Sequence, residues 1–124
     1  MARLLIIEDD ASVAKLISKH FEKGGFLCVW QGSGEDALAW LKKGDVVDVV
    51  ICDLGLPGMS GAQLVDHLRS DERTARVPII VCSGRTSMQD HAIALEAGAD
   101  LFLEKPLRMK TLEDEVRRLL SPRG

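Results

Sequence analysis

An acidic residue, Asp53, stands where an apolar run meets a loop rich in glycine and proline. The run spans residues 49–52, and the residues after it that suit a tight loop are Gly55, Pro57, Gly58 and Gly61. Removing a carboxylate from water is unfavourable unless the group meets a cation or hydrogen-bond donors. We therefore expect Asp53 to be exposed at the mouth of a site, where a carboxylate can act as a nucleophile or a metal ligand.

Four other polar residues also stand where apolar runs end. Glu8 and Asp9 come directly after the first run, Ser83 ends the fourth, and Lys105 follows the fifth. The carboxyl ends of parallel strands meet at one edge of a sheet, where open α/β folds bind their ligands. Five polar groups at one edge, Asp53 included, are hard to explain by solubility alone, so the pattern indicates a reaction site.

The motifs around these residues resemble those of the receiver domains of two-component response regulators. They are the Glu8-Asp9 pair, the Asp53 loop, the Ser83-Gly84 turn, and Lys105-Pro106 after Ala-Gly-Ala-Asp100. The resemblance extends over residues 2–120 and is to a stand-alone receiver of the chemotaxis type. It implies that Asp53 takes a phosphoryl group from a sensor histidine kinase or a phosphotransfer protein.

A magnesium site is implied by the same resemblance. Carboxylates held close together repel one another, and a divalent cation relieves that repulsion. Mg²⁺ prefers oxygen ligands and is usually held by one or two carboxylates together with water. Asp9 and Asp53 are expected to be direct ligands, and Glu8 is expected to act through water. In the family a backbone carbonyl two residues after the acceptor also binds the metal, and here that residue is Gly55.

The remaining roles follow from phosphoryl transfer, which asks the protein mainly for positioning and charge neutralisation. The resemblance makes Asp53 the nucleophile and Lys105 the cation that offsets charge on the transferring oxygens. Ser83, where the family often has threonine, is expected to donate its hydroxyl to the attached phosphoryl group. Gly55 and Arg85 are expected to flank the path of the water that hydrolyses the phosphoaspartate.

A switch residue is expected at Phe102, the aromatic position of the family, although Phe102 lacks the hydroxyl of the tyrosine often found there. When Ser83 moves toward the phosphoryl group, the Phe102 ring is expected to fill the vacated space. The surface from Ser87 to Leu120 would then change for binding of a downstream output protein, or for a phosphorylation-dependent dimer. An outward Phe102 ring gains no hydrogen bond, so we expect part of the active population to be present before phosphorylation. The switch is then shallow, because phosphorylation changes the populations only a little.

The spacing of apolar residues predicts five strands that alternate with five helices. Strands are expected at 3–7, 26–30, 46–52, 77–82 and 101–103, and helices at about 10–23, 34–43, 61–69, 87–97 and 109–119. This alternation indicates an α/β fold whose parallel sheet is covered on both faces. The resemblance implies the flavodoxin-like, doubly wound (βα)5 order 2-1-3-4-5. We expect a single receiver domain over residues 1–124, with 121–124 as a frayed end.

Individual residues predict where several helices begin and which of their sides face the core. Asp10 is expected to be a helix cap and not a metal ligand. Ser33 with Asp36, and Ser60 with Gln63, have the spacing of capping boxes. In the fourth helix, the predicted inward-facing residues are Ile93, Ala94 and Ala97.

Composition limits the classes of function. The chain has 124 residues, a formal net charge of −3, 46% hydrophobic residues and 28% charged residues, as in folded soluble domains. The negative charge argues against direct nucleic-acid binding and against docking on anionic membranes. The early apolar run is too short for a signal peptide or a membrane span, so we expect a cytoplasmic protein. The cysteines, Cys28, Cys52 and Cys82, are expected to be buried reduced thiols.

Three alternative functions compete with the phosphorylated receiver. A phosphatase with an aspartate nucleophile typically needs a second acid two residues later, where this chain has Gly55. A flavin carrier of the flavodoxin type would need a phosphate-binding loop rich in serine and threonine after the first strand. An interaction module that works without phosphorylation tends to lose an acid or the lysine of the site, and here all are present. We interpret the chain as a signalling switch that catalyses only its own phosphorylation and dephosphorylation.

Overall fold

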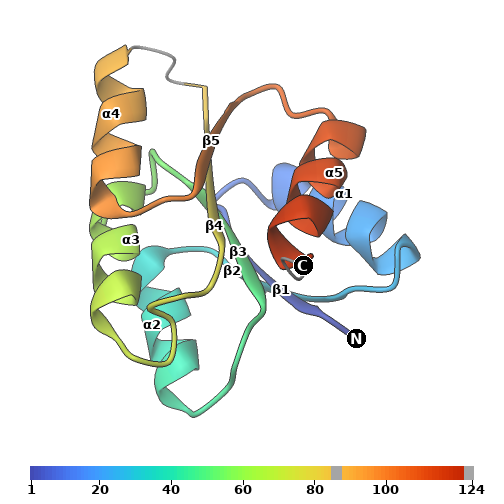
Figure 1. Ribbon diagram of the computed structural model, residues 1–124, viewed down its shortest axis with the longest axis horizontal. Coiled ribbons are helices and arrows are strands. Elements are labelled where there is room, and N and C mark those ends of the chain that lie inside the picture. The colour runs from blue at the N-terminus through green and yellow to red at the C-terminus, as the bar shows by residue number, and fades with distance from the viewer. Residues whose placement is uncertain (85–87, 122–124) are drawn as a thin grey trace.

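Five apolar segments pair side by side in a parallel sheet, which the computed structural model describes over residues 1–84 and 88–121 (Figure 1). The strands are β1 (Arg3–Ile7), β2 (Leu27–Gln31), β3 (Val49–Asp53), β4 (Ile79–Ser83) and β5 (Leu101–Glu104). The helices are α1 (Ala11–Lys23), α2 (Gly34–Lys42), α3 (Gly61–Ser70), α4 (Met88–Ala97) and α5 (Met109–Leu120). The strand order β2-β1-β3-β4-β5 confirms the predicted flavodoxin-like α/β fold. In the described ranges, no helix combines the length and the apolar character needed to cross a membrane.

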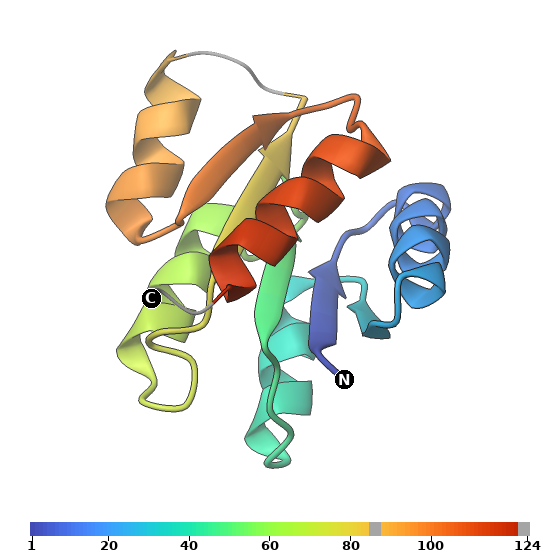
Figure 2. The same ribbon diagram turned by 45° about the vertical axis from the view of Figure 1, so that its right-hand side comes forward.

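Successive side chains of β1 enter two different cores. Leu4 and Ile6 pack with α1 and α5, whereas Leu5 and Ile7 pack with α2, α3 and α4. Figure 1 and Figure 2 show these two groups of helices on opposite faces of the sheet. A strand that is buried on both faces needs apolar residues at every position, and this is why the apolar runs do not alternate with polar residues.

Side-chain caps fix where three helices begin. The Asp10 carboxylate accepts hydrogen bonds from two backbone amides in the first turn of α1. Ser60 and Gln63 form a reciprocal capping box at α3, and the Ser33 hydroxyl accepts from the Asp36 amide at 3.1 Å. These caps satisfy amides that have no partner inside the helix. The loops that lead from the strands into α1, α2 and α3 are thereby held in defined positions.

The predicted strand boundaries need correction, mainly at the amino-terminal ends. β3 begins at Val49 and not at Val46, which is 67% exposed. Just before β3, Asp48 bonds to Arg3 with both its backbone and its side chain: its amide donates to the Arg3 carbonyl at 2.9 Å, and its carboxylate accepts the Arg3 amide at 2.7 Å. β2 and β4 also begin later than predicted, at Leu27 and Ile79, and the last four strands each continue one residue beyond their predicted ends.

The predicted inner face of α4 is partly wrong. Ala94 is fully buried, but Ile93 is 42% exposed and Leu95 is 43% exposed. Apolar residues lie all around this helix, so their spacing does not mark a single buried face. The predicted first residue of the helix, Ser87, lies outside the described residues, in which α4 begins at Met88.

The cysteines are reduced, and two of them are fully in the core as predicted. Cys52 and Cys82 are buried, while Cys28 is half-buried and donates a weak hydrogen bond to the Ser18 carbonyl. Burial raises the pKa of the Cys82 thiol to about 12, and it raises the pKa of the Cys28 thiol to about 11. Because the thiolate is the reactive form of cysteine, burial lowers the reactivity of these thiols at neutral pH.

Candidate functional site

The carboxyl ends of β1 and β3 bring three acidic side chains together. Ile7 of β1 is in register with Cys52 of β3, so the next residues of the two strands, Glu8 and Asp53, are neighbours. One carboxylate oxygen from each of Glu8, Asp9 and Asp53 lies within 4.8 Å of the other two. The acids that the sequence analysis selected therefore form one cluster at one edge of the sheet.

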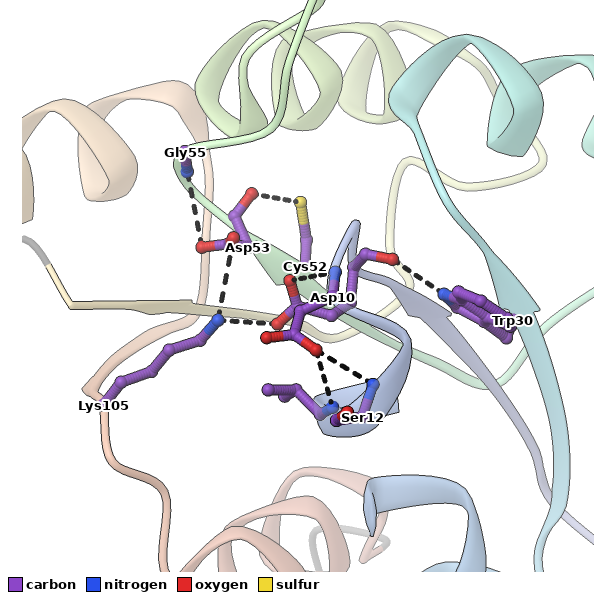
Figure 3. A network of polar contacts seen from close by, with 9 residues as sticks. Asp10, Ser12, Trp30, Cys52, Asp53, Gly55 and Lys105 are labelled. Atoms are coloured by element: carbon purple, nitrogen blue, oxygen red, sulfur yellow. Dashed lines mark hydrogen bonds and ion pairs between the residues drawn. The ribbon is translucent and has the colours of Figure 1, made fainter. Parts of the chain in front are cut away.

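Lys105 reaches this cluster from the loop that follows β5 (Figure 3). Its Nζ lies 2.6 Å from Glu8 Oε1 and 3.6 Å from Asp53 Oδ2. The backbone amide of Lys105 donates to the Ser83 carbonyl at 2.8 Å, which fixes the loop at its first residue. The Lys105–Pro106 peptide bond is cis. The lysine thus bridges two of the acids and lies closer to Glu8 than to Asp53.

Glu8 is the most buried acid of the cluster, with 3% of its surface exposed. Burial raises the pKa of its carboxyl group, and the hydrogen bond from Lys105 opposes this effect without cancelling it. Burial alone would lower the pKa of Lys105, but the hydrogen bond to Glu8 and the charge of Asp53 raise it above its ordinary value. Lys105 is therefore a cation at neutral pH, placed against two carboxylates.

Asp53 is held by the loop that follows it. Its side chain keeps 14% of its surface exposed, so it is less open than the sequence predicted. The Gly55 amide donates to Asp53 Oδ1 at 3.4 Å, and a Cβ built at Gly55 meets no heavy atom of the described residues within 4 Å, its chain neighbours aside. Gly61 lies so close to the Asp53 carbonyl and the Leu54 backbone that an added Cβ would overlap both. A glycine is needed at position 61 because the loop folds back onto the end of β3.

The predicted hydroxyl and switch residues lie on the neighbouring strands. Ser83 ends β4, is 1% exposed, and follows Cys82, which is in register with Asp53. Phe102 lies on β5, is 8% exposed and packs in the core on the side of α4. The predicted rim residue Arg85 lies outside the described residues.

Two contacts around the site were not predicted from the sequence. The indole Nε1 of Trp30 donates to the backbone carbonyl of Glu8 at 2.7 Å. Glu35 of α2 accepts the amide of Met59, in the loop after Asp53, at 3.1 Å. Trp30 is an ordinary strand residue by type and Glu35 an ordinary first-turn acid, so no local pattern marks either contact.

The cluster combines a partly exposed carboxylate, a fixed cation and two further acids. Carboxylate oxygens that approach one another within 4.8 Å are the hard ligands that Mg²⁺ prefers, so these residues fit that ion. Asp53 thus lies beside a cation and beside acids that fit a metal ion. Such surroundings suit a nucleophile, because cations stabilise the negative charge that builds up as it reacts.

Comparisons with known proteins agree with this chemistry. Residues 4–117 match the family described as the response regulator receiver domain. The DNA-binding response regulator MtrA of Mycobacterium tuberculosis is 36% identical over 118 residues, which are 95% of this chain and 50% of MtrA. The chain spans about half the length of the curated relatives that it matches.

Solved structures show the same fold. The Vibrio cholerae chemotaxis protein CheY4 is 28% identical, with a TM-score of 0.91 over 97% of this chain and 99% of that chain. The receiver domain of the Pseudomonas aeruginosa sensor histidine kinase PA1611, solved with a magnesium ion in its active-site cleft, is 24% identical with a TM-score of 0.87, over 96% of this chain and 97% of that chain.

These similarities establish a receiver domain, and they leave the stand-alone chemotaxis subtype that the sequence suggested unconfirmed. A DNA-binding regulator and a chemotaxis protein are both similar to this chain, and each contains the same kind of domain. This chain matches the receiver family over residues 4–117. The function of that family is to be phosphorylated by a histidine kinase in two-component signalling. The chain therefore belongs to the response-regulator receiver domain family.

Proposed function

We propose that Asp53 is the residue that accepts the phosphoryl group in this receiver domain. The observation that carries the proposal is its place at the end of β3, 3.6 Å from Lys105 Nζ and clustered with Glu8 and Asp9. Phosphoryl transfer to a carboxylate brings negative charges together, so it needs cationic groups at hand. Asp53 is the partly exposed member of this cluster that ends a strand of the sheet, and Lys105 lies against it.

The acids of the cluster are proposed to hold one Mg²⁺. Asp9 and Asp53 would supply carboxylate ligands, Glu8 would act through water, and Gly55 would supply its backbone carbonyl. When bound, the ion neutralises charge on the acids and on the phosphoryl oxygens. The magnesium ion in the Pseudomonas receiver domain supports this assignment for a related fold.

Three side chains divide the work of transfer. An oxygen of Asp53 forms the bond to phosphorus while the bond between phosphorus and the donor breaks. Lys105, already a cation beside Glu8, turns toward the phosphoryl oxygens and offsets their charge. Ser83 donates its hydroxyl to one of those oxygens. The domain acts as a switch that catalyses only its own phosphorylation and dephosphorylation.

The phosphorylated state is proposed to be read on the surface formed by α4, β5 and α5, through Ser83 and Phe102. The phosphodonor would be a sensor histidine kinase or a phosphotransfer protein. The output would be a downstream protein or a second copy of the chain. MtrA is named as DNA-binding, which supports an output that reaches DNA through another segment or protein and not through this acidic domain. Residues 1–124 are proposed to work as one receiver domain in the cytoplasm.

Incubation with acetyl phosphate and Mg²⁺, followed by mass measurement of the intact protein, tests the acceptor. The wild type should gain one phosphoryl group and Asp53→Asn should gain none, because the amide keeps the volume of the side chain and removes the nucleophile. Asp66→Asn, on the exposed side of α3, is the matched control and should react like the wild type.

Two results would contradict the proposal. Phosphorylation of Asp53→Asn at the wild-type rate would move the acceptor to another residue. An unmodified wild type that still bound its partner would favour the alternative, an interaction module that works without phosphorylation.

A further inference from the structure

Trp30 is nearly half exposed, yet the one polar atom of its side chain is hydrogen-bonded within the protein. The residue lies on the edge strand β2 and is 46% exposed, yet its Nε1 donates to the Glu8 carbonyl at 2.7 Å (Figure 3). Trp30 is in register with Ile6, so the ring reaches two residues along β1 to make this bond. An indole N–H on the surface can bond to water equally well. Here the N–H instead donates to the backbone of Glu8, an acid of the candidate site.

The carbonyl that Trp30 holds belongs to the peptide bond between Glu8 and Asp9. A peptide unit is planar, so fixing its oxygen also fixes the direction of the Asp9 amide and the start of the Asp9 side chain. The Glu8 amide, on the other side of the residue, donates to the Gln31 carbonyl at 3.1 Å. Two consecutive residues of β2 thus hold the backbone of Glu8 from both sides.

The far end of this short segment is fixed as well. The Asp10 amide donates to Glu8 Oε2 at 3.3 Å, and the Asp10 carboxylate caps α1. Asp9, whose carboxylate is exposed, lies between these two anchored residues. These contacts set the path of the loop, so the loss of one of them should change where the Asp9 carboxylate stands.

We propose that Trp30 is a positioning residue for the metal-binding acids, which orients the Glu8–Asp9 peptide through its indole N–H. The inference rests on the proposed magnesium site. Trp30→Phe keeps an apolar ring and removes the donor, so it should weaken Mg²⁺ binding by about five-fold, the effect of losing one ordinary hydrogen bond. At saturating Mg²⁺ the phosphorylation rate should return to the wild-type level, because Trp30 touches none of the reacting groups.

The experiment compares Trp30→Phe with Trp40→Phe, which makes the same replacement on α2, where Trp40 packs against the core. Mg²⁺ affinity is measured from amide shifts in an NMR titration, and the phosphorylation rate is measured as a function of Mg²⁺ concentration. Asp9→Asn is included to test the metal site by itself. In the wild type, the Trp30 indole resonance should shift with Mg²⁺ while that of Trp40 stays constant, a readout that needs no substitution at Trp30.

The results separate the two proposals. A raised half-saturating Mg²⁺ concentration in Trp30→Phe, with an unchanged plateau rate and a normal Trp40→Phe, supports the positioning role. If Asp9→Asn weakens Mg²⁺ binding but Trp30→Phe does not, or if the Trp30 indole resonance ignores Mg²⁺, the role of Trp30 is refuted and the metal site stands. If Asp9→Asn leaves the affinity unchanged, the proposed metal site itself is wrong.

Discussion

His91 stacks on Phe102, with ring centroids 4.8 Å apart and ring planes inclined by 17°. His91 is exposed on α4, and Phe102 is 8% exposed on β5, so the imidazole forms an outer cover over the buried ring. The stack links the proposed switch residue to the helix that forms the proposed output surface. A ring held on its outer face in this way is harder to turn outward.

Removal of the His91 ring should increase the structural response of the switch to phosphorylation. Stacked aromatic pairs contribute about 0.5–1.5 kcal/mol beyond the area they bury, so His91→Ala should free the Phe102 ring to populate both positions. We expect larger amide shifts over residues 88–120 on addition of beryllofluoride and Mg²⁺ in His91→Ala than in the wild type. His91→Phe restores a stacked ring and should respond like the wild type. Equal responses from all three proteins would show that His91 does not restrain the ring.

Glu8→Gln should raise the free energy of unfolding at neutral pH. Burial raises the pKa of Glu8 in the folded protein above the ordinary value of 4.5, so the ionised form is destabilising there. The wild type therefore gains stability as the pH falls through the folded pKa toward the unfolded one. The advantage of the glutamine variant should be largest at neutral pH and should vanish near the ordinary carboxyl pKa.

Urea unfolding at several pH values checks this prediction. Glu104→Gln, at the exposed end of β5, is the matched control and should change stability little at any pH. An advantage of Glu8→Gln that stays constant between neutral and acidic pH would mean that the charge of Glu8 is not what destabilises the fold.

Gly61→Ala should destabilise the protein by about 2 kcal/mol, because overpacking of a tight contact typically costs 1–3 kcal/mol. The added methyl group would overlap the backbone of Asp53 and Leu54, which cannot move aside as a side chain can. Gly55→Ala is the control and should be close to neutral, because no atom of residues 1–84 and 88–121 lies within 4 Å of the new atom, its chain neighbours aside. Urea unfolding of both variants measures the difference, and equal stabilities would remove the close approach as the reason for glycine at position 61.

Gly55→Glu should slow the loss of the phosphoryl group several-fold. A Cβ at Gly55 meets no neighbouring atom within the described part of the chain, so a glutamate is expected to fit there, and its side chain would narrow the path of water to the phosphorus of phospho-Asp53. The measurement is the decay of the phosphorylated protein after removal of the phosphodonor, with Gly55→Ala as the smaller replacement. A decay rate that is the same in all three proteins would place Gly55 away from the water path.

The sequence could predict the sheet and the acids of the site because both depend on residue type along the chain. A run such as Val49 to Cys52 must be buried on both faces, and the first acid after it must stand at the end of the strand. The strand order 2-1-3-4-5, which the family resemblance implied, then places the ends of β1 and β3 side by side. The proximity of Glu8, Asp9 and Asp53 therefore follows from this strand order, which residue types alone do not give.

Contacts made by long side chains could not be predicted from such patterns. Lys105 lies 2.6 Å from Glu8 and 3.6 Å from Asp53, and a sequence does not show which of two acids a flexible amine meets first. The reach of Trp30 to the Glu8 carbonyl depends on a rotamer and on the register of β2. The exposure of Ile93 depends on how far α4 covers the sheet, which an evenly apolar helix does not reveal.

Cys52 and Cys82 stand on adjacent strands and face opposite helix layers, Cys52 toward α2, α3 and α4, and Cys82 toward α1 and α5. A thiol reagent can reach either one only when the layer above it lifts away, since both are buried. The labelling rates of the two thiols thus report separately on the transient opening of each layer. The chain carries a native pair of probes, one on each face of the sheet, for asking which helix layer opens first.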